Sequence, residues 1–257
     1  MRLKDKAIII TGGTSGIGAA IATAAIREGA KVLVHGINED EGRSTIERLG
    51  SSAVLCIADL MKDDAPQIIV NSALAAFGKI DGLVNNAALF GGSNISEQSV
   101  EHFRAMMQIN LTAPLFLIQA AFEELKKSSG AVLNIGSINA HAGESKLLAY
   151  SISKGGMQTM TRNLANANGV HSVRFNQINP GWVLTEREYR DKVAVGLKQS
   201  WPQDLTRVDI PSGVMTTPEQ MAEGAIYWLS DESKPFTGSV VDLEQFSIIG
   251  RNPEKLG

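Results

Sequence analysis

The sequence of 257 residues predicts an α/β fold, a single domain with a doubly wound parallel sheet of about seven strands and helices on both faces. Short apolar runs alternate along the chain with segments of helical periodicity. The first run, at 7–10, is apolar at every position, which is typical of a strand buried on both faces. No repeat, charge block or Pro/Ser-rich linker divides the chain, so one domain over residues 1–257 is expected.

The same pattern defines each element of the first half. The apolar run at 7–10 predicts a strand, and Ala and Ile at helical spacing over 17–28, followed by Gly29, predict a helix. Gly50 closes the next helix, and Pro66 stands near the start of the third, where proline is tolerated. The remaining strands are expected at 31–34, 53–57 and 82–84, and the remaining helices at 39–49 and 65–77.

The second half continues this alternation. Strands are expected at 131–135, 172–178 and 240–243, and helices at 111–127, 150–167 and 218–229. Thr217 before Pro218, with Gln220 three residues after Thr217, fits a capped helix start. Such a sheet binds ligands outside the carboxyl ends of its strands, so chemistry is expected just after each strand.

The composition excludes several classes of protein. The charge of −3 argues against nucleic-acid binding. Cys56 is the only cysteine and lies in an apolar run, so a buried thiol is expected, and no metal site, because the four histidines lack paired spacing. No apolar run approaches about 18 residues, and the apolar stretch after Lys6 is too short for a signal peptide. A cytoplasmic protein without a membrane partner is expected.

A glycine-rich turn follows the first strand. Its glycines stand at 12, 16 and 18 in the run Thr11-Gly-Gly-Thr-Ser-Gly-Ile-Gly18. Glycine lets the backbone turn tightly and approach a ligand, and the next helix directs its free N–H groups and positive dipole end at the same point. The context between strand and helix favours a pyrophosphate site over an ordinary glycine-rich turn.

The residues at the adenosine end are less usual. The second strand ends in His35-Gly-Ile-Asn38, which contains neither the acid that binds the ribose of NAD nor a base for the 2′-phosphate of NADP. Asp59 follows the third strand and could accept a hydrogen bond from adenine. The alternative is that Asp59 caps the following helix.

Three features from separated places in the chain suggest hydride-transfer chemistry. These are the run Asn85–Ala88, Ser137, and the pair Tyr150 and Lys154, which share one helix face about 6 Å apart. Hydride transfer at a carbinol carbon requires a proton to move at the oxygen. The pKa of a free tyrosine is about 10. An ammonium and an oxidised nicotinamide could together lower this pKa by about 3 units, which requires about 4 kcal/mol of favourable interaction with the phenolate. Ser137 could orient the substrate oxygen. A Tyr/Lys pair alone is also common on solvated helices.

The combined set resembles the short-chain dehydrogenase/reductase family, which has a Rossmann-like fold. The glycine turn, Asp59, Asn85–Ala88, Asn110, Ser137, Tyr150, Lys154 and Pro180-Gly181 follow the family's order from Leu3 to about Leu243. The resemblance implies that Tyr150 is the acid/base, that Ser137 fixes the substrate, and that Lys154 holds the nicotinamide ribose and lowers the pKa of Tyr150. It also implies that Asn110 supports a water that links Lys154 to solvent.

The resemblance further implies which residues line the cofactor. Asp59 and Leu60 would lie near adenine, and Pro180 and the residues after it near the nicotinamide. The complete set is Gly12, Thr14, Ser15, Gly16, Ile17, Gly18, Gly36, Asp59, Leu60, Asn86, Ala87, Ala88, Tyr150, Lys154, Pro180, Gly181, Val183 and Thr185.

The chain departs from the family pattern at several positions. Ala88 stands where a glycine is usual, and Gly36 where NAD-type members carry Asp. Ser15 and Ile37 stand where NADP-type members often carry bases. Burying a 2′-phosphate without a cation costs more than omitting hydrogen bonds to a ribose. Of NAD and NADP, we therefore expect NAD. The tail over 244–257 also lacks the usual glycine-rich ending.

Two polar segments are expected to shape the substrate pocket. They are residues 138–146 and 182–188, and the second leads into a variable lid over 184–214. Their hydrogen-bonding groups favour a small hydroxylated substrate such as a sugar, sugar acid or polyol. The candidate substrate residues are Asn139, His141, Glu144 and Trp182. The alternatives are solvated loop positions for His141 and Glu144, and packing beneath the lid for Trp182.

The sequence thus favours an NAD(P)-dependent oxidoreductase that interconverts a secondary alcohol and a ketone. The alternatives are a 3-oxoacyl or other carbonyl reductase of the same family, a dehydratase or epimerase, and a non-catalytic dinucleotide-sensing protein. The family resemblance also implies a homotetramer joined through the helices at 111–127 and 150–167.

Overall fold

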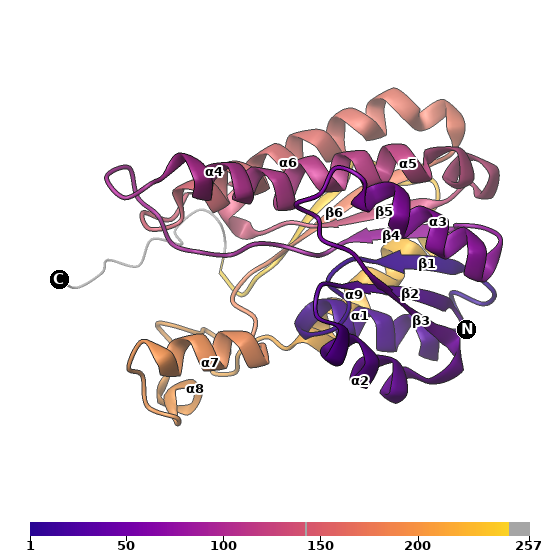
Figure 1. The fold of residues 1–257 in the computed structure, drawn as a ribbon. Coiled ribbons are helices and arrows are strands. Elements are labelled where there is room, and N and C mark those ends of the chain that lie inside the picture. The colour runs from indigo at the N-terminus through magenta and orange to yellow at the C-terminus, as the bar shows by residue number, and fades with distance from the viewer. Residues whose placement is uncertain (142, 247–257) are drawn as a thin grey trace.

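The fold centres on a parallel sheet of seven strands in the order β3-β2-β1-β4-β5-β6-β7 (Figure 1). The structure is a computed structural model that describes residues 1–141 and 143–246. The expected doubly wound α/β fold is confirmed, and its strand order reverses between β1 and β4. The strands are β1 Ala7–Ile10, β2 Lys31–Gly36, β3 Ala53–Ile57, β4 Gly82–Asn85, β5 Ala131–Ile135, β6 Arg174–Pro180 and β7 Val240–Leu243.

Two helical layers cover the sheet because alternate strand residues face opposite sides. Ile8 and Ile10 belong to a core with α1 Gly16–Arg27, α2 Glu39–Leu49 and α9 Pro218–Leu229. Ile9 faces the other core, built with α3 Ala65–Phe77, α5 Ala113–Ser128 and α6 Leu148–Asn168. Figure 1 shows these two layers above and below the strands. The capping box at Thr217 and Gln220 is confirmed.

The expected helix at 111–127 is part of a longer helical run. Ser99 accepts a hydrogen bond from the backbone of His102 and starts α4 Val100–Met107, which continues through a π-helical turn at Gln108–Thr112 into α5. The combined run Val100–Ser128 is long and apolar enough to cross a membrane by length and composition. Leu117, Ile118 and Ala121 pack into the core, so this is a partly buried core helix.

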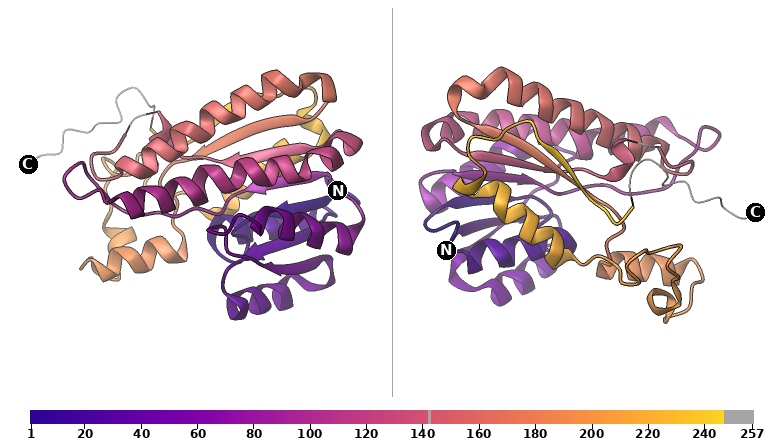
Figure 2. Two further views of the ribbon diagram at one scale, coloured as in Figure 1. Left: turned by 45° about the horizontal axis from the view of Figure 1, so that its top comes forward. Right: turned by 180° about the vertical axis from the view of Figure 1, so that it is seen from behind.

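The segment after β6 forms a small unit that projects from the body of the molecule (Figure 2). It contains α7 Glu186–Ala194 and α8 Trp201–Asp204. Trp201, Ile210 and Met215 form its apolar cluster, against which Trp182 and Tyr189 pack. A bridge between Val183 and Thr216 joins the two ends of this segment. The short 3-10 helices elsewhere are Gly50–Ser52, Ile138–Ala140, Gly169–His171 and Asp231–Ser233.

Candidate active site

The glycine-rich turn packs too closely for side chains. A Cβ added to Gly12, whose φ is +60°, would lie 2.9 Å from Ala87 Cα. A Cβ on Gly18 would lie 2.2 Å from Gly12 O. Ser15 begins α1 without a side-chain cap, so the N–H groups of the first turn, which have no intrahelical partner, point out of the helix. This cradle fits the pyrophosphate of a dinucleotide.

Two residues after β4 hold the turn in place. Asn86 Nδ2 donates to Thr11 O at 2.9 Å and to Gly12 O at 3.0 Å. Thr11 Oγ1 accepts hydrogen bonds from the backbone N–H groups of Asn86 and Ala87, both at 3.0 Å. The sequence predicts a role at the cofactor for Asn86 and Ala87 but none for Thr11, whose only signal is its position directly after the buried strand.

The adenosine end lacks room for the usual acid. A Cβ on Gly36 would lie 2.6 Å from Thr14 Cγ2. Ile37 is 70% exposed, and Asn38 accepts a hydrogen bond from Glu41 N and caps α2. Asp59 Oδ1 accepts from Met61 N at 2.9 Å, and Asp64 stands at the N-cap of α3, so the alternative that Asp59 caps the following helix is wrong. Leu60 is buried beside it.

Ser137, Tyr150 and Lys154 come together at the carboxyl end of β5. Ser137 follows β5, and the other two lie on the first turns of α6. Ser137 and Tyr150 are hydrogen-bonded through their side chains. Lys154 Nζ lies 5.7 Å from the centre of the Tyr150 ring and donates to Ile135 O at 2.8 Å. The side chain of Lys154 is 2% exposed, so its ammonium acts in a medium of low polarity.

Burial dominates the electrostatics of this group. It raises the pKa of Tyr150 to about 12, and the hydrogen bond with Ser137 lowers that pKa in part. It also lowers the pKa of Lys154 to about 8. We expected a lowered Tyr150 pKa from the lysine and an oxidised nicotinamide together. The protein's own groups instead leave the phenol protonated at neutral pH.

Asn110 lies in the π-helical turn between α4 and α5. Its Oδ1 accepts from Leu89 N at 2.7 Å, and its Nδ2 donates to Leu89 O at 2.9 Å and Ser153 Oγ at 3.0 Å. The contacts tie the chain just after Ala88 to α6 beside Lys154. Turns of this kind occur frequently at functional sites.

The residues expected on the nicotinamide side begin at the end of β6 and continue to the start of α7. Gly181 N donates to Leu243 O at 3.0 Å, and a Cβ on Gly181 would lie 2.1 Å from Glu244 Oε2. Thr185 caps α7 through Glu188 N, and its Cγ2 would lie 3.5 Å from a Cβ on Gly16. Thr185, near the start of the expected lid, thus lies beside the glycine turn.

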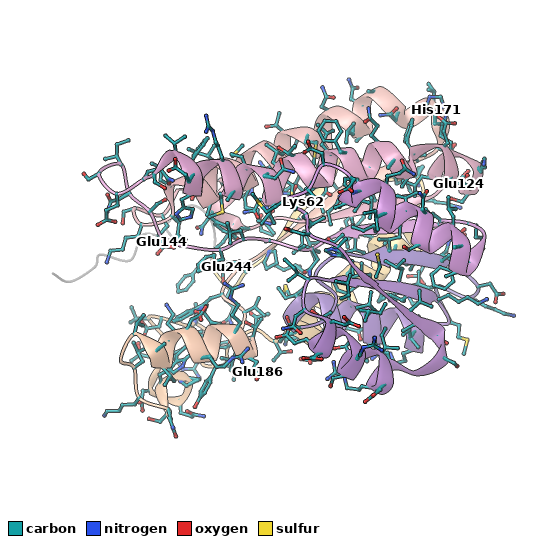
Figure 3. The ribbon with its side chains drawn as sticks, viewed as in Figure 1. Lys62, Glu124, Glu144, His171, Glu186 and Glu244 are labelled. Carbon is teal, nitrogen blue, oxygen red and sulfur yellow. The ribbon has the colours of Figure 1, made fainter. Side chains whose placement is uncertain are left out.

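The four candidate substrate residues are divided between two places. Asn139 N donates to Ser137 Oγ at 3.2 Å, and His141 Nε2 lies 3.0 Å from Asp242 Oδ1. Glu144 is exposed, and Figure 3 shows it with Glu244 at the end of the molecule from which the α7–α8 unit projects. These three candidate residues line a cavity of about 560 Å³, together with Asn94 and Ser151 among others.

Trp182 lies in the projecting unit. Its Nε1 donates to Glu188 Oε1 at 2.7 Å, and its ring stacks on Trp201 with centroids 5.7 Å apart. This is the packing role that we weighed as the alternative to substrate contact. The sequence could not show the pairing of His141 with Asp242, because the two residues are 101 positions apart.

Comparison with known proteins identifies the class. The family model for short chain dehydrogenase matches residues 6–192, and the chain belongs to this family. The chain is 32% identical to 3-oxoacyl-(acyl-carrier-protein) reductase FabG of Chlamydia muridarum, over 94% of this chain and 97% of that protein. It is 32% identical to L-fucose dehydrogenase of Mus musculus, over 90% of this chain and 84% of that protein. It is 31% identical to the NADP-dependent (R)-specific alcohol dehydrogenase of Lentilactobacillus kefiri over 94% and 96%. The protein is an oxidoreductase of the NAD(P)-dependent CH–OH type.

Proposed function

We propose that this oxidoreductase uses NAD to interconvert a secondary alcohol and a ketone on a small hydroxylated molecule such as a sugar, sugar acid or polyol. The observation that carries the proposal is the contact between Ser137 and Tyr150 beside the buried Lys154. The glycine turn at the same edge of the sheet supplies the cradle for the dinucleotide.

Each side chain of the group has its own role in the proposed reaction. Ser137 orients the substrate oxygen, and Tyr150 donates a proton to a ketone oxygen or takes one from an alcohol. Lys154 keeps donors for a ribose hydroxyl because Ile135 O takes one of the three ammonium protons. A nicotinamide, when bound, supplies the hydride chemistry and, if oxidised, a positive charge that favours the phenolate.

The charge at the adenosine end supports NAD. The first turn of α2 carries Glu39, Asp40 and Glu41. The nearby Arg43 is engaged by Glu39, with Nε and Oε1 3.0 Å apart. Carboxylates at this position disfavour the 2′-phosphate of NADP, whereas the uncharged ribose of NAD meets no such repulsion.

The hydrogen-bonding groups of residues 138–146 support a polar substrate, and the mouse relative is named for a sugar. We propose that residues 184–214 form a lid over this substrate, because they form the projecting unit and its Thr185 lies beside Gly16 of the glycine turn. A second candidate, reduction of a 3-oxoacyl group, is favoured by the Chlamydia relative.

A substrate panel separates these candidates. Purified protein would be incubated with NAD and sugars, polyols or long-chain secondary alcohols, and separately with NADPH or NADH and a 3-oxoacyl thioester, and nicotinamide absorbance followed. We expect NADH formation with a sugar or polyol. Oxidation of long-chain alcohols alone, or reduction of the thioester alone, would contradict the proposed substrate class. The Tyr150→Phe variant controls for background turnover.

We also propose a cytoplasmic homotetramer that pairs through α5 and α6. Leu115 and Phe116 on α5 are 40% and 47% exposed, and Ile152 on α6 is 45% exposed. Contact between copies would remove this apolar surface from water. Sedimentation as a monomer at micromolar concentration would refute the assembly.

A further inference from the structure

His35 occupies an unusual place at the end of β2. It is 3% exposed and lies between the glycine turn and the residues that follow β3. Its imidazole contacts the backbone on both sides. Gly12 N lies 3.3 Å from Nδ1, and Ala58 O lies 3.0 Å from Nε2.

These contacts define the protonation of the ring. A carbonyl oxygen only accepts, so Nε2 carries the proton and donates to Ala58 O. Nδ1 is then free to accept from the Gly12 N–H. Burial lowers the pKa of His35, which agrees with a neutral ring. The ring is therefore a bridge with one donor and one acceptor.

The bridge connects two parts of the dinucleotide site. Gly12 is the first glycine of the turn, with its N–H held by His35 and its C=O held by Asn86 Nδ2. His35 O also accepts from Gly13 N at 2.9 Å. On the other side, Ala58 directly precedes Asp59 and Leu60, the residues expected near adenine. One side chain thus fixes the distance between the pyrophosphate turn and the adenine side.

We propose that His35 is a positioning residue for the dinucleotide, acting through the Gly12 peptide rather than by touching substrate. Its acceptor nitrogen holds the turn in the conformation that leaves the later N–H groups of α1 for the pyrophosphate. Loss of that acceptor leaves the half-buried Gly12 N–H without its partner in the protein, and the turn relaxes. Loss of the donor to Ala58 O has a smaller effect, because a carbonyl oxygen tolerates a missing partner better than an N–H group does.

Two substitutions separate the nitrogens. In His35→Asn the amide oxygen takes the place of Nδ1 and keeps the acceptor for Gly12. In His35→Gln the amide nitrogen reaches the place of Nε2 and keeps the donor for Ala58 O. NADH and NADPH would first be compared on the wild-type protein. The cofactor that binds more tightly would then be titrated into both variants, with fluorescence as the signal. Thermal unfolding would be measured in parallel.

We expect the dissociation constant of His35→Asn to stay within about threefold of wild type, and that of His35→Gln to rise about tenfold, about the loss of one hydrogen bond. The matched control is Cys56→Ser, because Cys56 is buried opposite His35 in β3 and bonds Ser72 on α3. Its dissociation constant should not change. Equal affinity of the Asn and Gln variants, or a rise in Cys56→Ser as large as in His35→Gln, would overturn the proposal. Tighter dinucleotide binding by His35→Asn than by His35→Gln, at equal melting temperatures of the two variants, would support it.

Discussion

The dinucleotide half and the substrate half of this active-site edge are built in different ways. In the first, the Gly12 peptide is held on both sides by His35 and Asn86, and a Cβ on Gly18 has no room. In the second, α7 and α8 project from the body around their own cluster, and Val195 and Val208 are 75% and 68% exposed. Close packing constrains the residue types in the first half, whereas the exposed positions of the second half constrain them less. Under the proposed function, the closely packed half binds the cofactor and the exposed half contributes to substrate choice.

The largest effect should come from removing the Tyr150 hydroxyl. Tyr150→Phe deletes the group that moves the proton, so we expect kcat to fall at least about a hundredfold while the NADH dissociation constant changes by less than about threefold. The matched change in the other half is Tyr189→Phe, which removes a hydroxyl that bonds Gln199 O. That variant should keep kcat within about threefold. Retained turnover in Tyr150→Phe would remove Tyr150 from the mechanism.

The next effect concerns the stability cost of a buried ammonium. The folded-state pKa of Lys154, about 8, lies below the ordinary value of 10.5, so its cation destabilises the fold below pH 8 and the penalty fades as the pH rises towards 10.5. Relative to Lys154→Met, the wild type should gain about 2 kcal/mol of unfolding free energy between pH 7 and pH 10. Denaturant unfolding at the two pH values measures this.

The matched control for that experiment is Lys127→Met, because Lys127 is 70% exposed on α5. Its difference from wild type should be the same at both pH values. A pH-independent difference for Lys154→Met would mean that Lys154 is not perturbed by burial.

A smaller effect tests the packing of the glycine turn. In Gly18→Ala the added methyl would lie 2.2 Å from Gly12 O, so the turn must shift, and the NADH dissociation constant should rise about tenfold or more. Gly169→Ala makes the same change where no atom lies within 4 Å of the new Cβ, and its NADH affinity should match wild type. Equal NADH dissociation constants for the two variants would show that close packing does not constrain the residue type at position 18 of the glycine turn.

The sequence predicted the parts of the fold that local patterns encode. Buried strands such as Ala7–Ile10 and the capping box at Thr217 follow from runs and spacings of a few residues. The glycines at 12 and 18 and the pair Tyr150 and Lys154 were recognised for the same reason. Local patterns therefore led to the predicted cofactor site and catalytic group, whose roles stay predictions.

The parts that the sequence could not supply depend on distant contacts. His35 gains its role from Gly12 and Ala58, each 23 residues away. His141 meets Asp242 across 101 residues, and Trp182 turns to Trp201 rather than to the predicted pocket. The pKa of Tyr150 depends on burial that neighbouring residue types do not report. Substrate residues belong to this group because their partners are set by the whole fold.

Titration of the purified protein with NADH and, separately, with NADPH tests the central claim most directly. The glycine turn and the carboxylates Glu39, Asp40 and Glu41 should give saturable binding of both, with NADH tighter. Binding of neither cofactor by folded protein, or an NADPH dissociation constant at least about tenfold lower than that of NADH, a difference of about 1.4 kcal/mol, would contradict this account of the dinucleotide half.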